Sequence, residues 1–334
     1  MSVPMRVLFR VAAGPRVGFG HLVRCRSLAR ALGLRPSVSI RGSAATEKIA
    51  VTGGWDVQAV QDETALGLSG VGVLIVDDPC PRHAARWVGW GRRHHMLTVT
   101  VHDLGLGYVA SDLGVDGSIE PRTDMRGRHG DLTGPAYAVL DPAVSEMWAR
   151  RQERVPQQVL VALGGGAHVY DCASRLCRAI AARVSDVRIR VASGFATGRQ
   201  ARPLDRGEWI TAPDGLAGEL ATASVAVVAG GVTLYEACAL GTPTVAVALT
   251  SPQHTTIRAF AARGAIIDGN RIAAGAQTVN GVAAEVDRLL RTPLACDRLT
   301  IAGRHLVDGR GAYRVADRIT ALYNAAHSGA TDAA

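Results

Sequence analysis

The segment VAVVAGGVTLYEACAL, residues 225–240, reads as a buried strand, a glycine turn and a helix. Residues 225–229 are all apolar, as in strands that are buried on both faces of a parallel sheet. Gly230 and Gly231 then allow a sharp turn, and Gly241-Thr242-Pro243 ends the helix that follows. This strand–turn–helix unit predicts an α/β protein.

The same unit recurs along most of the chain, because apolar runs of strand length alternate with stretches of helical spacing. The first predicted helix is His21–Leu32, and further helices are predicted at 82–92, 171–183, 215–222 and 253–263. Predicted strands fall at 6–12, 37–40, 72–76, 96–101, 157–163, 187–192, 209–211, 225–229 and 244–249. Such alternation is typical of βα units on a parallel sheet.

The length of the chain and a restart of this pattern predict two domains. The chain has 334 residues, and single hydrophobic cores stop growing at roughly 250–300 residues. The pattern begins again at about Gln157, so we expect a Rossmann-like domain over residues 1–150 and another over 151–330. Ligands of open α/β sheets bind where the carboxyl ends of the strands face a crevice. We therefore expect a cleft between the two domains.

The charge of the chain is positive and comes almost entirely from arginine. The net charge is +8, and Lys48 is the only lysine. This pattern fits a coding bias or an affinity for phosphate, which arginine binds in a bidentate manner. No basic stretch is interleaved with stacking aromatic residues, so nucleic-acid binding is disfavoured. A weak contact with an anionic membrane surface stays open.

Cysteine usage and hydropathy predict a cytoplasmic protein. None of the six cysteines forms a CxxC pair, which favours free buried thiols in a reducing compartment. Arg6, Arg10 and Arg16 interrupt any signal-peptide core. No apolar run approaches the roughly 20 residues that a membrane span needs.

Three glycine-bearing loops each follow a predicted strand and open a helix. They are Gly14–His21, Gly164-Gly165-Gly166 and Gly230-Gly231. Such loops let the backbone approach a phosphate, and the helix N-terminus supplies unpaired N–H groups. Three of them together favour a phosphorylated ligand.

Dinucleotide, nucleoside triphosphate and metal sites are disfavoured. Val23 stands where a GxGxxG fingerprint needs its third glycine, and Arg41 ends the second strand where an acidic residue belongs. GxxxxGK[ST] and DxD motifs are absent, as is any His/Cys/Asp cluster with metal-ligand spacing. We therefore expect neither a cofactor nor a metal.

Thr233 and Glu236 allow two interpretations. They match a capping box, in which Thr233 caps the helix and Glu236 reaches back. Alternatively, the Thr233 hydroxyl and the N–H groups of Gly231–Thr233 bind a diphosphate. Glu236, one turn further along, would then accept hydrogen bonds from two vicinal ribose hydroxyls.

Several segments resemble one family. FGHLVRCRSLARAL (19–32) is similar to the GxGHxxRCxxLAxxL motif of the sugar-nucleotide hydrolase of pseudaminic acid biosynthesis, which acts on UDP-2,4-diacetamido-2,4,6-trideoxy-β-L-altropyranose. That family includes spore-coat polysaccharide proteins described as glycosyltransferases. Residues 134–142, 159–167 and 228–253 resemble its other motifs, so the resemblance runs from about Arg6 to Gly264.

The resemblance implies a fold, a ligand and a site. The fold is GT-B, two Rossmann-like domains, as in the glycosyltransferase that makes lipid II, and the ligand is a nucleotide-diphosphate sugar, by resemblance UDP-linked. The nucleotide falls on Gly164, Gly165, Gly230, Gly231, Val232, Thr233 and Glu236. The sugar falls on Gly20, Arg24 and Gln253. The catalytic position falls on His21, with Asp77 and Asp78 beside it.

The chain departs from the family pattern on the sugar side. Pro79 replaces a tyrosine, Pro252 replaces an asparagine and His168 replaces an aspartate. These departures put the altrose-type substrate in doubt more than the hydrolysis.

His21 opens a helix at a glycine-rich turn, where a neutral imidazole can take a proton from water or from an acceptor hydroxyl. Asp77, Asp78 and Asp103 end predicted strands and either orient His21, bind the sugar or cap helices. The first hypothesis is a nucleotide-sugar hydrolase, and the second is an inverting glycosyltransferase for a surface polysaccharide or a glycosylated natural product. An epimerase is disfavoured because its paired carboxylates are absent. A catalytically inactive nucleotide-sugar-binding protein is the hypothesis from another class.

Overall fold

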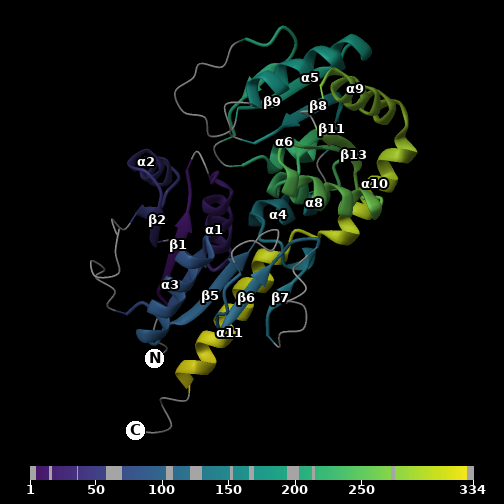
Figure 1. The fold of residues 1–334 in the computed structure, drawn as a ribbon. Helices are drawn as coiled ribbons and strands as arrows, with labels where there is room; N and C mark the ends of the chain where they lie inside the picture. Colours follow the sequence, from purple (N-terminus) through teal and green to yellow (C-terminus); the bar gives the residue numbers. More distant parts are fainter. Residues whose placement is uncertain are drawn as a thin grey trace. The chain divides into compact units, whose positions relative to one another are not determined.

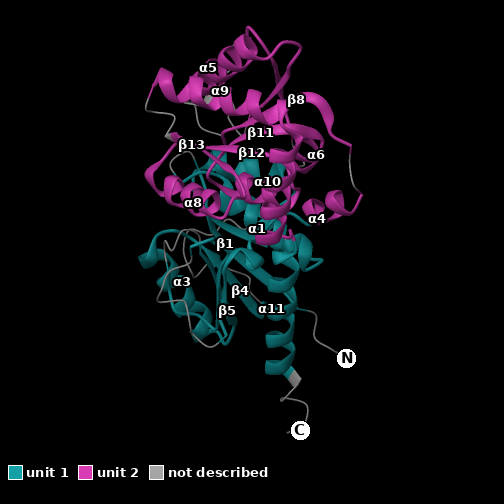
Figure 2. Ribbon diagram, turned by 90° about the vertical axis from the view of Figure 1, so that its right-hand side faces the viewer, with its two compact units in different colours: residues 1–142, 310–334 teal, residues 143–309 magenta. Residues whose placement is uncertain are grey.

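The computed structural model describes residues 5–14, 17–35, 37–57, 70–102, 108–120, 130–150, 153–164, 169–193, 203–212, 215–271 and 275–328. The chain divides into two compact α/β units, coloured separately in Figure 2. Unit 1 comprises residues 1–142 and 310–334, and unit 2 comprises residues 143–309.

Over its described residues, unit 1 has one parallel sheet of seven strands in the order β3-β2-β1-β4-β5-β6-β7 (Figure 1). Its elements are β1 (Val7–Ala12), α1 (Gly20–Ala31), β2 (Ser37–Arg41), α2 (Ala44–Thr52), β3 (Asp56–Val57), β4 (Val73–Asp77), α3 (Pro81–Arg93), β5 (Leu97–His102), β6 (Leu113–Asp116), β7 (Leu132–Thr133), η1 (Pro135–Tyr137) and α11 (Gly311–Ser328). From β1 the chain first adds β2 and β3 on one side and then returns to add β4 on the other side, so the switch point lies between β1 and β4. Such a switch point is where open α/β sheets bind ligands.

Unit 2 repeats this plan with a parallel sheet of six strands in its described part, in the order β10-β9-β8-β11-β12-β13. Its elements are α4 (Pro142–Ala149), β8 (Val155–Ala162), α5 (Val169–Arg183), β9 (Arg188–Ala192), β10 (Glu208–Ile210), α6 (Ala217–Thr222), β11 (Ala223–Ala229), α7 (Val232–Ala239), β12 (Thr244–Ala248), α8 (Ser251–Ala262), β13 (Ile267–Arg271), α9 (Ala276–Arg291) and α10 (Pro293–Leu306). Its switch point lies between β8 and β11. The α/β fold class and the alternation of strands and helices predicted from the sequence are therefore present.

Each unit has its own apolar core. In unit 1, alternate residues of β1 point to opposite faces: Val7, Phe9 and Val11 pack with α1 and α11, whereas Leu8 packs under α3. In unit 2, the central strands β8, β11 and β12 pack against α5 and α9.

The division into units differs from the sequence-based boundaries in two places. Helix α4 belongs almost wholly to unit 2, which begins at Ala143, and the C-terminal helix α11 belongs to unit 1. The reason for the second difference is the apolar stripe Val315, Ile319 and Tyr323, which is buried in the core of unit 1. The expected cleft between the domains stays a prediction.

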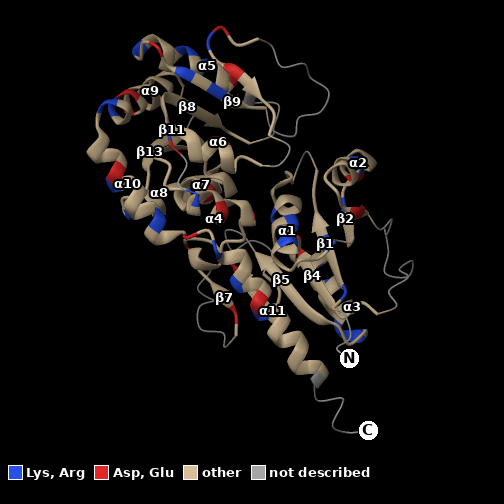
Figure 3. Ribbon diagram, turned by 180° about the vertical axis from the view of Figure 1, so that it is seen from behind, with Lys and Arg blue, Asp and Glu red and all other residues tan. Residues whose placement is uncertain are grey.

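Cysteine state and surface charge were also predicted from the sequence. The six cysteines all lie within the described residues and are free thiols, of which Cys25, Cys177 and Cys238 are buried. Figure 3 shows arginine and lysine on helices of both units, interspersed with acidic residues. Across the described residues, no helix is both long and apolar enough to cross a bilayer.

The position of α11 leads to a stability prediction. Ile319→Ala should lower the free energy of unfolding by about 2–4 kcal/mol, because Ile319 is 0% exposed and its removal leaves a cavity. The matched control is Ile301→Ala on α10, which is 71% exposed and should change stability by less than about 0.5 kcal/mol. Urea unfolding followed by tryptophan fluorescence measures both. Equal effects of the two substitutions would show that α11 is not part of the core.

Candidate active site

The candidate active site of unit 1 lies at its switch point. Strand β1 ends at Ala12, and the chain then turns through Gly14 and Gly18, whose backbone groups form a reciprocal hydrogen-bonded bridge. Gly14 and Gly18 both have positive φ angles, which glycine adopts without strain. Helix α1 begins directly afterwards at Gly20, so His21 lies in its first turn.

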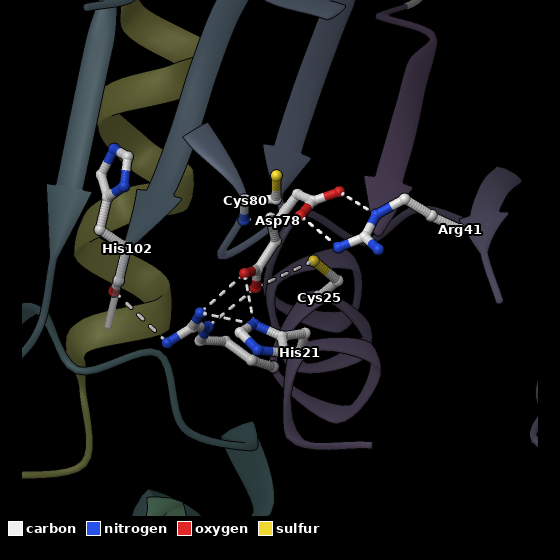
Figure 4. Close-up of polar contacts among 8 residues, drawn as sticks. His21, Cys25, Arg41, Asp78, Cys80 and His102 are labelled. Atoms are coloured by element: carbon white, nitrogen blue, oxygen red, sulfur yellow. Dashed lines mark hydrogen bonds and ion pairs between the residues drawn. The ribbon is translucent and has the colours of Figure 1, made fainter. Parts of the chain in front are cut away.

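Asp77, the last residue of β4, holds His21 and Arg24 together (Figure 4). The Nδ1 atom of His21 lies 2.7 Å from Asp77 Oδ1. Arg24 donates from Nη2 to Oδ1 at 2.7 Å and from Nε to Oδ2 at 2.9 Å, which is a bidentate pair. Arg24 also donates to the carbonyl of His102 at the end of β5. Three secondary-structure elements, α1, β4 and β5, are thereby fixed around one carboxylate.

This contact sets the tautomer of His21. An ionised carboxylate only accepts hydrogen bonds, and Asp77 Oδ1 lies closer to His21 Nδ1, at 2.7 Å, than Arg24 Nη2 does, at 3.2 Å. We therefore assign the proton of the neutral imidazole to Nδ1, where it is donated to Asp77, and the lone pair to Nε2. Within the described part of the chain, Nε2 makes no hydrogen bond. The His21 side chain is 16% exposed, whereas that of Asp77 is 1% exposed. His21 therefore presents a proton acceptor at the surface of the switch point.

Asp77 is ionised despite its burial. Burial by itself would raise the pKa of Asp77, but the charge of Arg24 and the interactions and hydrogen bonds of His21 and Arg24 with the carboxylate outweigh it and hold that pKa well below the usual range. The neighbouring Cys25 thiol has a raised pKa, first because of burial and then because of Asp77. Cys25 is therefore a neutral thiol beside the carboxylate, 3.6 Å from Oδ2.

Asp78, which the sequence predicts beside His21, does not contact His21. Successive residues at a strand end point to opposite faces, so Asp78 faces α3 whereas Asp77 faces α1. Asp78 instead accepts two hydrogen bonds from Arg41, each at 2.7 Å, and one from the backbone N–H of Cys80. Asp103, the third predicted acid, lies outside the described residues.

In unit 2, the predicted nucleotide segment also lies at the switch point. Gly230 and Gly231 follow β11, and α7 begins at Val232. The described side chains of α7 from Leu234 to Ala239 are buried except for Glu236. Val232, Thr233 and Glu236 thus form the accessible face of the helix.

The structure excludes one of the two interpretations of Thr233, the capping box. The N-cap of α7 is Gly231, so Thr233 is the second residue of the helix and cannot close a capping box. Gly231 has no side chain that could accept from the N–H groups of Val232 and Thr233, which lie before the first intrahelical hydrogen bonds, whereas the N–H of Leu234 donates to the carbonyl of Gly231. An anion is the kind of ligand that such a helix start favours.

The capping box of unit 2 occurs instead at α8, where Gln253 was predicted to bind the sugar. Gln253 is the third residue of α8, and its Oε1 accepts from the backbone N–H groups of Leu249 and Thr250. Its Cβ and carbonyl lie against Gly230, where any side chain would clash. Gln253 therefore shapes the loop after β11 and has its carboxamide oxygen occupied by the backbone.

The other predicted residues are placed as follows. Arg24 was predicted to bind the sugar, but its guanidinium is buried against Asp77 and His102. Gly20 is exposed at the start of α1, and Gly164 is exposed directly after β8 with a positive φ. Gly165 and His168 lie outside the described residues. Among the described residues, no three His, Cys, Asp or Glu side chains gather as a metal site requires.

Sequence reasoning missed two arginines that bind the C-terminal end of α7. Arg304 and Arg154 donate to the carbonyls of Ala239 and Gly241 at the C-terminal end of α7, where cations are favourable. Arg304 also stacks over Trp148 at 4.1 Å. These long-range pairs join residues far apart in the sequence, and no local spacing signals them.

Comparison with known proteins supports the fold. No family model matches the sequence. The chain is similar to the spore coat polysaccharide biosynthesis protein SpsG of Bacillus subtilis (strain 168), with 29% identity over 229 residues. That match covers 63% of this chain and 64% of SpsG, which is less than two thirds of the relative's length.

Two solved structures are similar over nearly their whole length. One is the spinosyn rhamnosyltransferase SpnG complexed with thymidine diphosphate, with a TM-score of 0.59, 18% identity and coverage of 96% of this chain and 100% of SpnG. The other is a Listeria monocytogenes protein described as a UDP-N-acetylglucosamine 2-epimerase, with a TM-score of 0.60, 12% identity and coverage of 96% and 97%. At these identities the likeness shows the fold, and the chain has the GT-B fold of two Rossmann-like units.

The buried Asp77 carboxylate makes stability depend on pH. Its folded-state pKa is lowered, so its contribution is present above the unfolded-state pKa of about 3.9 and is lost as the pH falls toward the folded-state value. Asp77→Asn leaves Arg24 as an uncompensated buried charge and should cost about 3–5 kcal/mol at pH 7. The difference from the unsubstituted protein should shrink below about pH 4.

Urea unfolding at pH 7, 5 and 3 measures this difference. The control is Asp287→Asn, which breaks an exposed pair with Arg291 on α9 and should cost no more than about 0.5 kcal/mol. A loss for Asp77→Asn as small as that of the control would mean that Asp77 does not hold the site together.

Proposed function

We propose that this chain is an inverting glycosyltransferase that moves a sugar from a nucleotide diphosphate to a hydroxyl acceptor. The observation that supports it most is the pairing of His21 with Asp77, which leaves Nε2 as the proton acceptor at the switch point of unit 1. A His oriented by a carboxylate is suited to general-base catalysis.

In the proposed step, the acceptor hydroxyl gives its proton to His21 Nε2. Its oxygen attacks the anomeric carbon while the bond from that carbon to the diphosphate oxygen breaks, and the bonding pair leaves with the nucleoside diphosphate. Asp77 stabilises the imidazolium that forms through its hydrogen bond to Nδ1. A single displacement of this kind inverts the anomeric configuration.

The nucleoside diphosphate binds, in this proposal, at the start of α7. The N–H groups of Val232 and Thr233 and the Thr233 hydroxyl bind the diphosphate, and the helix dipole favours its negative charge. Glu236 lies on the same accessible face one turn along and accepts from the ribose hydroxyls. These groups also stabilise the charge that develops on the leaving group.

Transfer to a hydroxyl is preferred here over hydrolysis, which was the first hypothesis from the sequence. The similarity to a rhamnosyltransferase and to a polysaccharide biosynthesis protein supports transfer, whereas neither relative is described as a hydrolase. Hydrolysis is the second candidate, because His21 can take a proton from water as well as from an acceptor. The similar epimerase has the same fold, which by itself does not separate the two activities.

His21→Ala should lower the release of nucleoside diphosphate by roughly 100- to 10,000-fold, because the general base is removed. The affinity for UDP or TDP should stay within about twofold, since His21 lies in unit 1 and the proposed nucleotide site in unit 2. The assay incubates UDP-sugar and TDP-sugar panels with and without alcohol and sugar acceptors. Isothermal titration with UDP and TDP measures binding.

The control is His305→Ala, an exposed histidine on α10, which should leave turnover unchanged. Nucleotide release that requires an acceptor supports transfer, and release in water alone supports the hydrolase instead. Full turnover by His21→Ala would exclude His21 as the base.

Glu236→Ala should weaken UDP binding roughly tenfold or more, because two charge-assisted hydrogen bonds are lost. The same substitution should matter less for 2′-deoxy-UDP, which offers one ribose hydroxyl fewer. Glu285→Ala on the surface of α9 is the matched control. Isothermal titration measures the affinity of all three proteins for both nucleotides. An equal loss of affinity for UDP and for 2′-deoxy-UDP would show that Glu236 does not bind the 2′-hydroxyl.

A further inference from the structure

A second polar cluster lies on the opposite face of the sheet of unit 1, at the same edge as His21. In the sheet register, Ala12 at the end of β1 pairs with Arg41 of β2, and Val11 pairs with Asp77 of β4. Asp78, one residue further, therefore lies beside Ala12. The bidentate ion pair between Arg41 and Asp78 thus bridges across the end of β1.

Arg10 lies below this bridge on the same face, because it precedes Ala12 by two residues in β1. Arg10 is only 6% exposed. Its guanidinium donates to Ser39 Oγ at 2.6 Å and stacks over the Trp87 ring at 4.6 Å. Its Nε is buried and has no hydrogen-bond partner. An unpartnered buried donor of this kind costs free energy and needs an explanation.

The cluster contains more positive than negative charge. Burial is the main cause that lowers the pKa of Arg10, to about 10, and the nearby charges of Arg41 and Arg86 lower it further, whereas Asp78 raises it. Arg10 and Arg41 thus share the carboxylate of Asp78, and Arg86 adds a further positive charge that acts on Arg10. Asp78 is already bound by Arg41 and by the Cys80 N–H.

Arg41 gives this excess charge access to solvent. Its side chain is 31% exposed, whereas that of Asp78 is 2% exposed. Asp78 occupies Nε and Nη2 of Arg41, and among the described residues Nη1 makes no hydrogen bond. The guanidinium is thus held in a fixed orientation with donors left for a ligand, as in sites that recognise phosphate or carboxylate.

We infer that Arg41, with Arg10 beneath it, forms an anion subsite that recognises a phosphate or carboxylate group of the acceptor. This inference rests on the proposed transferase function. Asp77 and Asp78 are consecutive residues at the carboxyl end of β4. Their partners His21 and Arg41 therefore lie at the same end of the sheet, on its two opposite faces. Figure 4 shows His21 and Arg41 on either side of the end of β4. The subsite would select acidic acceptors, whereas His21, oriented by Asp77, activates their hydroxyl.

The test is a binding measurement that does not depend on turnover. The full chain is saturated with UDP, so that the phosphate-binding helix start of unit 2 is blocked, and is then titrated with inorganic phosphate or, in a second arm, with glucuronate. The indole N–H signal of Trp87 in ¹H–¹⁵N spectra reports on the subsite, because Arg10 stacks on that ring. Trp87→Phe assigns the signal.

We expect one of the two anions to shift the Trp87 signal in a saturable manner, and the anion that does so identifies a phosphate or a carboxylate acceptor. Arg41→Gln should raise the dissociation constant by about tenfold or more. Asp78→Asn should lower it, because the competing carboxylate is removed. Arg92→Gln, at the other end of α3, is the matched control and should bind as the unsubstituted protein does.

A protein whose Trp87 signal responds to neither anion, or an Arg41→Gln variant that binds as tightly as the control, would overturn the inference. The Asp78→Asn variant controls for a folding defect in Arg41→Gln, because it is expected to change the dissociation constant in the opposite direction. Failure of UDP to bind at all would instead count against the proposed nucleotide site, so the two failures are distinguishable.

Discussion

The buried carboxylate of Asp77 is the constraint on which the rest of unit 1 depends. A carboxylate that is 1% exposed stays ionised only where cations and hydrogen bonds compensate for its lost hydration. Arg24 and His21 supply that compensation, and both lie on the first two turns of α1. The pairing therefore fixes α1 against the end of β4 and gives His21 its orientation and tautomer. The same interaction thus stabilises the fold of unit 1 and orients the proposed base.

The sequence was sufficient to predict the fold class, since the apolar periods of strands and helices are local signals. The helix α2 was missed because its capping box uses Thr46 where the usual signature has Glu or Gln. Strand β13 was missed because its register is interrupted opposite β12 and it contains Gly269. The return of α11 to unit 1 depends on long-range packing, which periodicity alone cannot assign to one core rather than another.

The sequence was sufficient to predict the motifs of the site but not which side chains pair with one another. His21 and the α7 segment stand at strand ends that the sequence reveals. Which of Asp77 and Asp78 meets His21 depends on one residue of strand register, which reverses the face. The capping role of Gln253 was not predicted, because a T-x-x-Q capping box and a sugar contact look alike in a sequence. Arg41 was noted only as an argument against a dinucleotide site, since its partner Asp78 is 37 residues away.

The two units have the same plan, in which a glycine turn at a switch point leads into a helix. The base proposed for one unit and the anion site proposed for the other are what a displacement of a nucleoside diphosphate requires. The most direct measurement of this account is the anomeric configuration of the product, read by ¹H NMR as the reaction proceeds. The account predicts a glycoside of inverted configuration. A product of retained configuration would contradict a single displacement assisted by His21.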